Sequence, residues 1–259
     1  MGRAKKRFGQ HFLTQEDVAK RIVDALPTVS PAESVLEVGP GRGMLTQFLL
    51  KNHSTLYFVE ADRDMIPLLH ERFPLIGSRL IQADFLKLDL HTLPKFHMIG
   101  NFPYNISSQI LFKVLDNREQ VPTMVGMFQK EVAERIVAKS GSRTYGILSV
   151  LTQAFYSCEY MFTVEPSAFT PPPKVQSGII RLIRDDTKQM NRARERFFRR
   201  VVKMAFNQRR KMLRNSLKAL LEEYAVNDQS LLSMRPEQLT VQQFVDLADY
   251  MNANKINVT

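Results

Sequence analysis

The chain has 259 residues, 44% of them hydrophobic, so it can bury a core as one large domain or as a catalytic domain with a smaller partner. The single cysteine, Cys158, excludes a disulfide framework and a cysteine-ligated zinc site. No apolar run is long enough to span a bilayer, and no signal-peptide pattern follows the basic N-terminus. We therefore expect a soluble, cytoplasmic protein without membrane contact. The five histidines show no ligand spacing, so we expect no metal.

The first predicted element is a helix that ends near Leu26. Thr14 and Asp17 have the spacing of a capping box, which would open this helix. Val18 and Ile22 then fall on one face together with Leu26, and we expect that face to point inward.

A glycine-rich turn follows the first predicted strand. The residues from Ser34 to Val38 are typical of a short buried strand, and the turn Gly39-Pro40-Gly41-Arg42-Gly43 leads from it into a helical pattern. Such a turn lets the backbone approach a ligand closely, with a helix N-terminus facing it. Met44 stands where a dinucleotide fingerprint needs Gly or Ala, and the Gly-Lys-Ser/Thr of a phosphate-binding loop is absent.

The next two predicted strands each lead to an acidic residue. Thr55 to Val59 ends at Glu60, and Leu80 to Ala83 ends at Asp84. Taken alone, each acid is explained as a solvent-facing residue at a strand end. Because the carboxyl ends of parallel strands meet at one edge, the two acids together favour a nucleoside-like cofactor. Glu60 would accept hydrogen bonds from ribose hydroxyls and Asp84 from an adenine amino group. S-adenosylmethionine fits this pattern better than NAD.

The tetrapeptide Asn101-Phe102-Pro103-Tyr104 follows a fourth apolar strand, from Phe96 to Gly100. An aromatic amine is a poor nucleophile because its lone pair is delocalised into the ring. The side-chain oxygen of Asn101 and the carbonyl of Pro103 could accept both of its N–H bonds, while Tyr104 stacks on the base. No charged general base is then needed. The alternative is an ordinary exit from a strand into a turn.

Two further strands are expected, from Tyr160 to Val164 and from Gly178 to Ile183, as an antiparallel end of the sheet. Their connection contains Phe169 and three consecutive prolines, which stiffen the backbone beside it. Phe169 is either a loop aromatic folded onto the core or an exposed ring that stacks on a base, and we favour stacking. The polar loop from Ser140 to Gly146 is either a plain connector or a contact for substrate.

Only helices are predicted after Arg184, at 192–206, 210–223 and 240–251, and Thr240 with Gln243 forms a second capping box. Alternating strands and helices before this point predict an α/β fold with a doubly wound, mostly parallel sheet. The change of pattern near Asp185 and Asp186 predicts a catalytic domain at 1–185 and a small helical domain at 186–259.

Positive charge is concentrated in the predicted helical domain. Between Lys188 and Lys218 there are twelve Lys or Arg residues and one acid, a net charge of +11, so the other residues together carry −1 of the total of +10. A solvated helix face usually mixes both signs, and this one-sided run favours contact with nucleic acid. The candidate phosphate-binding residues are Arg199, Arg200, Lys203, Arg209, Arg210 and Lys211. Arg3 to Arg7 form a second basic segment.

From Phe8 to about Leu247 the chain resembles the ribosomal RNA adenine N6,N6-dimethyltransferases, most closely those that modify the small subunit. The motifs that carry this resemblance occur in the family's order and spacing. They are Gln10-His11-Phe12-Leu13, Glu37-Val38-Gly39-Pro40-Gly41-Arg42-Gly43, Glu60, Asp84, Asn101-Phe102-Pro103-Tyr104-Asn105-Ile106-Ser107, Phe169-Thr170-Pro171-Pro172-Pro173-Lys174-Val175 and Arg209-Arg210-Lys211.

The resemblance implies a Rossmann-like class I S-adenosylmethionine-dependent methyltransferase domain with a helical C-terminal domain. It implies that His11 and Leu13 close over the cofactor, that Gly39 and Gly41 border its methionine part, and that Glu60 and Asp84 hold the ribose and adenine. Asn101 would lie between the cofactor and the target amine, and Phe169 would face the target base opposite Tyr104. His11 and Phe102 stand where many members have Asn and Leu, and Ala83 where Gly is common. The first of these departures puts the role of the His11 side chain in doubt.

The implied reaction is dimethylation of N6 on two adjacent adenosines in a hairpin near the 3′ end of 16S rRNA, by a monomer without metal. One alternative is the related enzyme that dimethylates a single large-subunit adenosine; Gly39-Pro40-Gly41 and the basic helical domain argue against it. A second alternative is a non-enzymatic nucleic-acid-binding or assembly protein of the same fold. The intact Asn101–Tyr104 segment and the cofactor acids favour an enzyme.

Overall fold

The structure is a computed structural model that describes residues 11–30, 33–53 and 55–256. The basic segment Arg3–Arg7 and the motif residue Gln10 lie outside the described residues. The chain divides into two compact units, one built from residues 1–133 and 158–184 and the other from residues 134–157 and 185–259. The second unit thus includes an internal segment, 134–157, besides the chain beyond Asp185. The division into domains at 185/186 remains a prediction.

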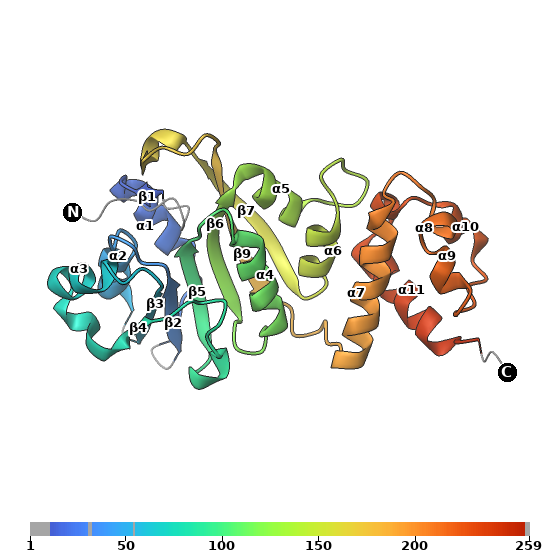
Figure 1. Ribbon diagram of the computed structural model, residues 1–259, viewed down its shortest axis with the longest axis horizontal. Helices are drawn as coiled ribbons and strands as arrows, with labels where there is room; N and C mark the ends of the chain where they lie inside the picture. Colours follow the sequence, from blue (N-terminus) through green and yellow to red (C-terminus); the bar gives the residue numbers. More distant parts are fainter. Residues whose placement is uncertain (1–10, 31–32, 54, 257–259) are drawn as a thin grey trace. The chain divides into compact units, whose positions relative to one another are not determined.

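The first unit is built around a seven-stranded sheet with the order β4-β3-β2-β5-β6-β9-β7 (Figure 1). Neighbouring strands from β4 to β6 are parallel, and β9 is antiparallel to β6. The strands are β2 (Ser34–Val38), β3 (Leu56–Glu60), β4 (Leu80–Gln82), β5 (Phe96–Asn101), β6 (Thr123–Gln129), β7 (Tyr156–Val164) and β9 (Ser177–Arg184). Both strands expected after residue 159 are present, and β9 gives the sheet its predicted antiparallel end. The expected doubly wound α/β fold is confirmed.

The crossovers between the parallel strands contain helices. The helices and turns of this unit are α1 (Glu16–Asp24), α2 (Thr46–Asn52), α3 (Met65–Arg72), η2 (Pro74–Arg79), η3 (Leu90–Thr92), α4 (Ser107–Asp116) and η4 (Pro166–Ala168). Helix α5 (Lys130–Val137) spans the point where the chain passes to the second unit. Figure 1 shows α4 lying across one face of the sheet beside β5.

The capping box predicted at Thr14 is wrong. Helix α1 begins at Glu16 after Gln15, and no side chain caps it. The Thr14 hydroxyl instead donates to the carbonyl of Ala168 at 3.0 Å, and its backbone N–H donates to the same oxygen at 2.8 Å. These bonds extend a two-stranded sheet in which β1 (Phe12–Leu13) pairs antiparallel with β8 (Phe169–Thr170). Thr14 therefore bonds to the segment before β8 and does not cap helix α1.

The second unit is helical, as expected, and α7 packs against α11. Its elements are α6 (Ile147–Gln153), α7 (Arg192–Asn207), α8 (Leu213–Ser216), α9 (Lys218–Leu221), α10 (Gln229–Ser233), η5 (Pro236–Gln238) and α11 (Val241–Ala253). The Thr240 capping box is confirmed, since its hydroxyl accepts from the N–H of Gln243. The helix expected at 210–223 begins late and is interrupted at Leu217, where φ is −101° and ψ is 10°.

The loop from Ser140 to Gly146 belongs to the second unit and is tied to it. The N–H of Gly141 donates to the carbonyl of Glu237 at 2.7 Å, and the Arg209 guanidinium donates to the carbonyl of Ser142 at 3.3 Å. The Tyr145 ring meets the ring of Phe206 with centroids 6.1 Å apart. The loop therefore has a structural role within this unit; its contact with substrate remains a prediction.

The side chain of Phe102 fills the space between two glycines. It is 1% exposed, and a Cβ atom added at either Gly100 or Gly126 would lie 2.4 Å from its ring. Its ring also meets that of Phe128 edge-on, with centroids 5.5 Å apart. A large ring fits between β5 and β6 because both facing positions lack a side chain. Because Phe102 stands between Asn101 and Pro103, this packing holds the backbone of both neighbours in place.

We expect Gly126→Ala to lower the free energy of unfolding by about 1–3 kcal/mol, because the added methyl group overpacks the Phe102 site. Combined with Phe102→Leu, the same substitution should cost less than it does alone, since the shorter side chain leaves room for the methyl group. Urea denaturation of the two single variants and the double variant measures both effects. Additive free energies would show that the two positions do not share one space.

Candidate active site

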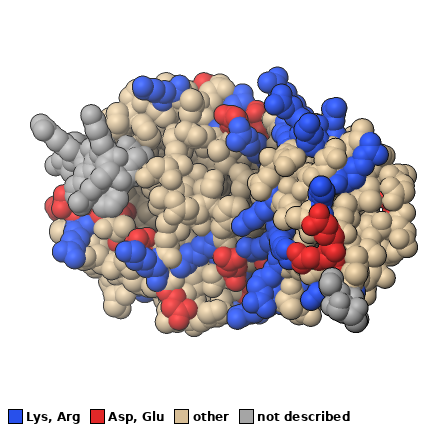
Figure 2. Space-filling model, turned by 45° about the vertical axis from the view of Figure 1, so that its right-hand side comes forward, with Lys and Arg blue, Asp and Glu red and all other residues tan. Residues whose placement is uncertain are grey.

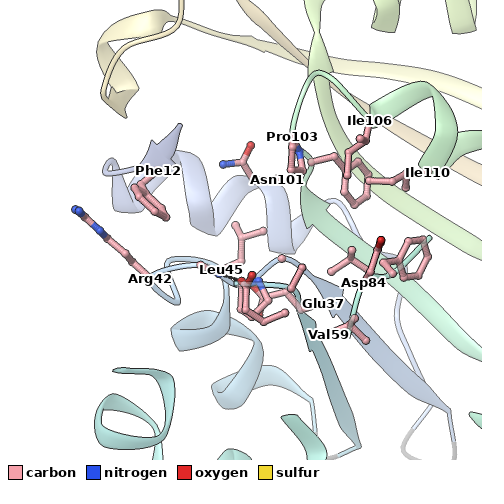
Figure 3. Close-up of a pocket in the computed structure, with 18 of the residues that line it drawn as sticks. Phe12, Glu37, Arg42, Leu45, Val59, Asp84, Asn101, Pro103, Ile106 and Ile110 are labelled. Carbon is pink, nitrogen blue, oxygen red and sulfur yellow. Dashed lines mark hydrogen bonds between the residues drawn. The ribbon is translucent and has the colours of Figure 1, made fainter. Parts of the chain in front are cut away.

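One cavity of about 530 Å³ lies at the carboxyl ends of β2, β3, β4 and β5 (Figure 3), within the size range of ligand-binding clefts. Nine of the residues predicted from sequence line it: His11, Leu13, Gly39, Gly41, Glu60, Asp84, Asn101, Pro103 and Tyr104. The structure thus brings together side chains from the N-terminal segment and from the ends of four strands. Their individual roles remain predictions.

The turn after β2 is formed by glycines with positive φ, 72° at Gly39 and 55° at Gly41, a region that side chains disfavour. A Cβ atom at Gly41 would also lie 3.2 Å from the Phe12 ring. The Arg42 guanidinium also lies over the Phe12 ring, 4.4 Å from the ring centroid. Figure 3 shows Phe12 and Arg42 together at this side of the cavity. The turn therefore places bare backbone against the cavity.

Glu60 is 5% exposed at the end of β3 and is held by backbone donors. One carboxyl oxygen accepts from the N–H of Gly41 at 3.0 Å, and the other accepts from the N–H of Asp62 at 2.8 Å. Burial raises the pKa of Glu60, while hydrogen bonds from the backbone of Asp62, Gly41 and Ala61 act in the opposite direction. A carboxylate offers about four acceptor sites, one more than these three backbone donors use. The carboxyl group is thus oriented in advance and can still accept a hydroxyl donor from a ligand.

Glu37, one residue before the end of β2, opens the motif Glu37–Gly43 and lines the cavity, but the sequence analysis assigned it no role. It is 1% exposed, and its Oε2 accepts from the hydroxyl of Thr46 at 2.6 Å. Burial raises the pKa of Glu37 to about 8, which favours the neutral form of this carboxyl group. The signal in the sequence was an acid inside an otherwise apolar strand, directly before the glycine turn.

Asp84 lies in the turn after β4 and is exposed at the cavity. Its Oδ1 accepts from the N–H of Leu86 at 2.9 Å, which leaves Oδ2 available to a ligand. Lys113 of α4 holds the same turn by donating to the carbonyls of Leu86 at 2.9 Å and Leu88 at 2.6 Å. Loss of hydration on burial lowers the pKa of Lys113. The sequence analysis did not identify Lys113, because no local sequence pattern links it to the turn after β4, more than twenty residues earlier in the chain.

Asn101 is the last residue of β5, and its amide is oriented by the N-terminal segment. The Nδ2 group donates to the backbone carbonyl of His11 at 3.0 Å. A carbonyl can only accept, so the amide nitrogen must face His11 and the Oδ1 atom must face away. Figure 3 shows the Asn101 nitrogen on the side of the segment that carries Phe12, with the oxygen directed elsewhere. The side-chain acceptor at this strand end is therefore fixed before any substrate binds.

The turn after Asn101 presents a carbonyl and an aromatic ring. The carbonyl of Pro103 accepts from the N–H of Ile106 at 3.2 Å and keeps one lone pair. The hydroxyl of Tyr104 lies 2.5 Å from the hydroxyl of Ser177, and its ring stacks on the His11 ring with centroids 5.6 Å apart and planes inclined by 28°. Burial raises the pKa of the Tyr104 phenol. Both Ser177 and the ring of His11 are partners that the sequence analysis did not anticipate.

Phe169 does not line the cavity, and its expected exposed position is wrong. The residue is 3% exposed and belongs to the hydrophobic cluster that contains Phe12, Leu13 and Ile22. The physical reason is its place in β8, where it lies opposite Leu13 of β1. Strand alternation directs the Phe169 side chain inward and leaves Thr170 exposed. In this structure the ring is a core residue and is not available to stack on a base.

The six candidate phosphate-binding residues belong to the second unit and fall into two groups. Arg199 pairs with Glu195 at 2.6 Å with only 18% of its side chain exposed, and Arg200 pairs with Glu223 at 3.1 Å. Arg209 donates to the loop carbonyl described above. The exposed residues Lys203, Arg210 and Lys211 make no ion pair within the described part of the chain. Figure 2 shows Lys and Arg side chains gathered over this unit.

Within the ranges that the structure describes, no three His, Cys, Asp or Glu residues cluster in a way that could hold a metal ion. Over the same ranges, no helix is long and apolar enough to cross a membrane. The expectation of a metal-free site remains a prediction.

Comparison with known proteins identifies the family. The model of the ribosomal RNA adenine dimethylase family matches residues 1–253. The chain belongs to this family. It is 52% identical to the ribosomal RNA small subunit methyltransferase A of Cytophaga hutchinsonii over 253 residues, covering 96% of this chain and 98% of that protein. It is 50% identical to the protein of the same name from Bacteroides thetaiotaomicron, covering 95% of this chain and 92% of the relative.

Solved structures agree with this assignment. A dimethyladenosine transferase from Plasmodium falciparum superposes with a TM-score of 0.79 at 25% identity, covering 95% of this chain and 99% of that one. The 23S rRNA methyltransferase ErmE superposes with a TM-score of 0.68 at 26% identity, covering 92% and 99%. The expectation of a Rossmann-like methyltransferase fold with a helical C-terminal part is confirmed.

We expect Phe169→Ala to lower the free energy of unfolding by about 3–5 kcal/mol, as truncation of a buried aromatic ring does. The matched control is Thr170→Ala on the exposed face of the same strand, which should change it by less than about 0.5 kcal/mol. Chemical denaturation measures both. A Phe169→Ala protein as stable as the wild type would place the ring outside the core and return it to the candidates for base stacking.

Proposed function

We propose that this protein transfers methyl groups from S-adenosylmethionine to N6 of two adjacent adenosines in a hairpin near the 3′ end of 16S rRNA, as a step of small-subunit biogenesis. The observation that carries the proposal is the orientation of Asn101, whose amide nitrogen is held by His11 so that its oxygen serves as an acceptor at the cavity. Relatives of about 50% identity named for the small subunit favour this substrate over the large subunit.

The cavity suits the cofactor. Glu60 keeps an acceptor site for a ribose hydroxyl, and Asp84 keeps Oδ2 for the adenine amino group. The backbone at Gly39 and Gly41 leaves room for the methionine part, while His11 and Leu13 line the cavity beside them. When bound, S-adenosylmethionine supplies an electrophilic methyl group on a sulfonium centre. The residues of this chain then have only to orient the target amine against it.

The proposed chemistry relies on two neutral acceptors. Asn101 Oδ1 and the carbonyl of Pro103 would each accept one N–H of the adenine amine, which turns its nitrogen lone pair toward the methyl group. The bound cofactor would supply the methyl group of the new N–C bond and keep the electron pair of the broken S–C bond, and the amine would release its extra proton to solvent. As positive charge develops on nitrogen, both acceptors bind its protons more strongly. Tyr104 stacks on the base and fixes its plane.

Substrate RNA would be bound mainly by the second unit. The proposal assigns phosphate contact first to Lys203, Arg210 and Lys211, because their side chains are exposed and pair with no acid among the residues that the structure describes. Arg199, Arg200 and Arg209 act less directly, since each already makes an intramolecular contact. We further propose that the protein acts as a monomer, without metal, in the cytoplasm where ribosomes assemble.

A transfer assay tests the proposed function. Purified protein, S-adenosylmethionine with a tritiated methyl group, and small or large ribosomal particles from cells lacking the modification are incubated separately. Label should enter the small particles and be recovered as N6,N6-dimethyladenosine. Label in large particles only would support the alternative enzyme, and label in neither would support a binding or assembly role.

Glu60→Ala and Asn101→Ala should have different effects. Removing the ribose acceptor should weaken cofactor binding by about 1–3 kcal/mol, because ligand hydroxyls lose their partner in a buried site. Removing the Asn101 amide should mainly slow methyl transfer, with a milder effect on cofactor affinity. Calorimetry and single-turnover assays separate the two quantities. An identical pattern in both variants would contradict this division of roles.

Arg210→Glu combined with Lys211→Glu should weaken RNA binding and flatten its salt dependence, because each lost phosphate contact removes about one unit from the slope of log affinity against log salt concentration. Cofactor affinity should not change. The matched control is Arg235→Glu with Lys255→Glu, two exposed basic residues of the same unit outside the cluster. Titrations at several salt concentrations measure the slopes, and equal slopes for both double variants would place the phosphate-binding surface elsewhere.

A further inference from the structure

The side chain of His11 contacts the base side of the proposed site. Its ring stacks on Tyr104, with centroids 5.6 Å apart, a separation at which aromatic pairs attract each other. Its Nδ1 lies 2.7 Å from the carbonyl of Pro171. Because a carbonyl only accepts, Nδ1 must carry a proton and donate it to this bond. The imidazole is thus fixed by a ring contact and a hydrogen bond at the same time.

The neighbouring residue contacts the opposite side of the site. Phe12 lies against the glycine turn, where a Cβ atom at Gly41 would be 3.2 Å from its ring, and the Arg42 guanidinium covers it. Successive side chains of an extended segment point in opposite directions. The segment therefore divides its contacts, with Phe12 toward the cofactor turn and His11 toward Tyr104 and the proline-rich connection.

The stacked arrangement also limits where a target base can lie. Rings in contact leave no space for a third ring between them, so a base that stacks on Tyr104 must use the face that His11 does not cover. Phe169 is buried and cannot hold the Tyr104 ring from the substrate side. The tyrosine hydroxyl is anchored to Ser177 at 2.5 Å, and the His11 ring restrains its plane.

We propose that the His11 side chain is a positioning residue for methyl transfer, which covers one face of Tyr104 and fixes the plane on which the target adenine stacks. This inference rests on the proposed function. It assigns the imidazole to the substrate base, whereas the backbone carbonyl of the same residue orients Asn101. His11 would then align both Tyr104 and Asn101, the two residues that contact the target adenine.

Three variants separate the two contacts of the imidazole. His11→Ala removes both, His11→Phe keeps a ring on Tyr104 but loses the hydrogen bond to Pro171, and His11→Asn keeps a donor but loses the ring. We expect the single-turnover rate on undermethylated small ribosomal particles to fall by about tenfold to a hundredfold in His11→Ala and His11→Asn, because the base is misplaced. His11→Phe should recover to within about threefold of the wild type.

Calorimetry with S-adenosylhomocysteine supplies the second measurement. Its affinity should stay within about twofold of the wild type in all three variants, since the ring is assigned to the base and not to the cofactor. A loss of this affinity in His11→Ala and His11→Phe would overturn the inference and make the imidazole a cofactor contact. Recovery in His11→Asn but not in His11→Phe would also overturn it, because the hydrogen bond would then be the essential contact.

The activity of the wild-type protein separates a failure of the proposed function from a failure of the role assigned to His11. If the wild-type protein does not methylate the particles, the proposed function fails. If it does methylate them and the variants retain full rates, only the role of His11 fails. Thermal unfolding of each variant shows whether a low rate reflects loss of the fold, and if His11→Ala unfolds, the comparison of His11→Phe with His11→Asn still tests the role of the ring.

Discussion

The parallel alignment of β2, β3 and β5 is the constraint on which the site depends. Parallel hydrogen-bonded strands must end at the same edge of the sheet, and here they end in a glycine turn, Glu60 and Asn101. Residues far apart in the sequence are thereby placed around one cavity without any contact between their side chains being required. The packing of the Phe102 ring against Gly100 and Gly126 then holds the end of β5 in place next to Asn101. The cavity is a consequence of sheet topology, refined by a few local contacts.

Much of this arrangement could be predicted from the sequence because it rests on local signals. Short apolar runs gave the strands, and polar residues directly after them gave Glu60, Asp84 and Asn101 as neighbours. The predictions that were wrong concern residues whose position is set by a contact with a distant part of the chain and not by their local sequence. Thr14 has the spacing of a helix cap, but its hydroxyl bonds to Ala168. Phe169 stands beside prolines like a loop residue, but pairing with Leu13 turns it into the core.

The charged cluster shows a second limit of sequence reasoning. Counting charges between Lys188 and Lys218 correctly found an excess, but it could not show which of them are already paired. Glu195 and Glu223, one inside the run and one beyond it, each hold an arginine. The sequence analysis assigned no role to Lys113 or Glu37 for a related reason, since the first acts through carbonyls distant in the chain and the second is changed by burial. Residue type indicates the sign of a charge, and only the fold indicates whether it is available.

The second unit is assembled from two separate stretches of the chain, and this has a consequence for evolutionary exchange. The N–H of Asp185 donates to the carbonyl of Phe155 at 2.9 Å, Gly141 bonds to Glu237, and Tyr145 packs on Phe206. A recombination event that joined the chain beyond residue 185 to a foreign catalytic domain would leave these partners behind. The helices would then expose apolar surface that α6 and its loop now cover. Transplanting this unit between relatives therefore requires residues 134–157 to accompany the C-terminal helices, although they precede strand β9 of the first unit in the sequence.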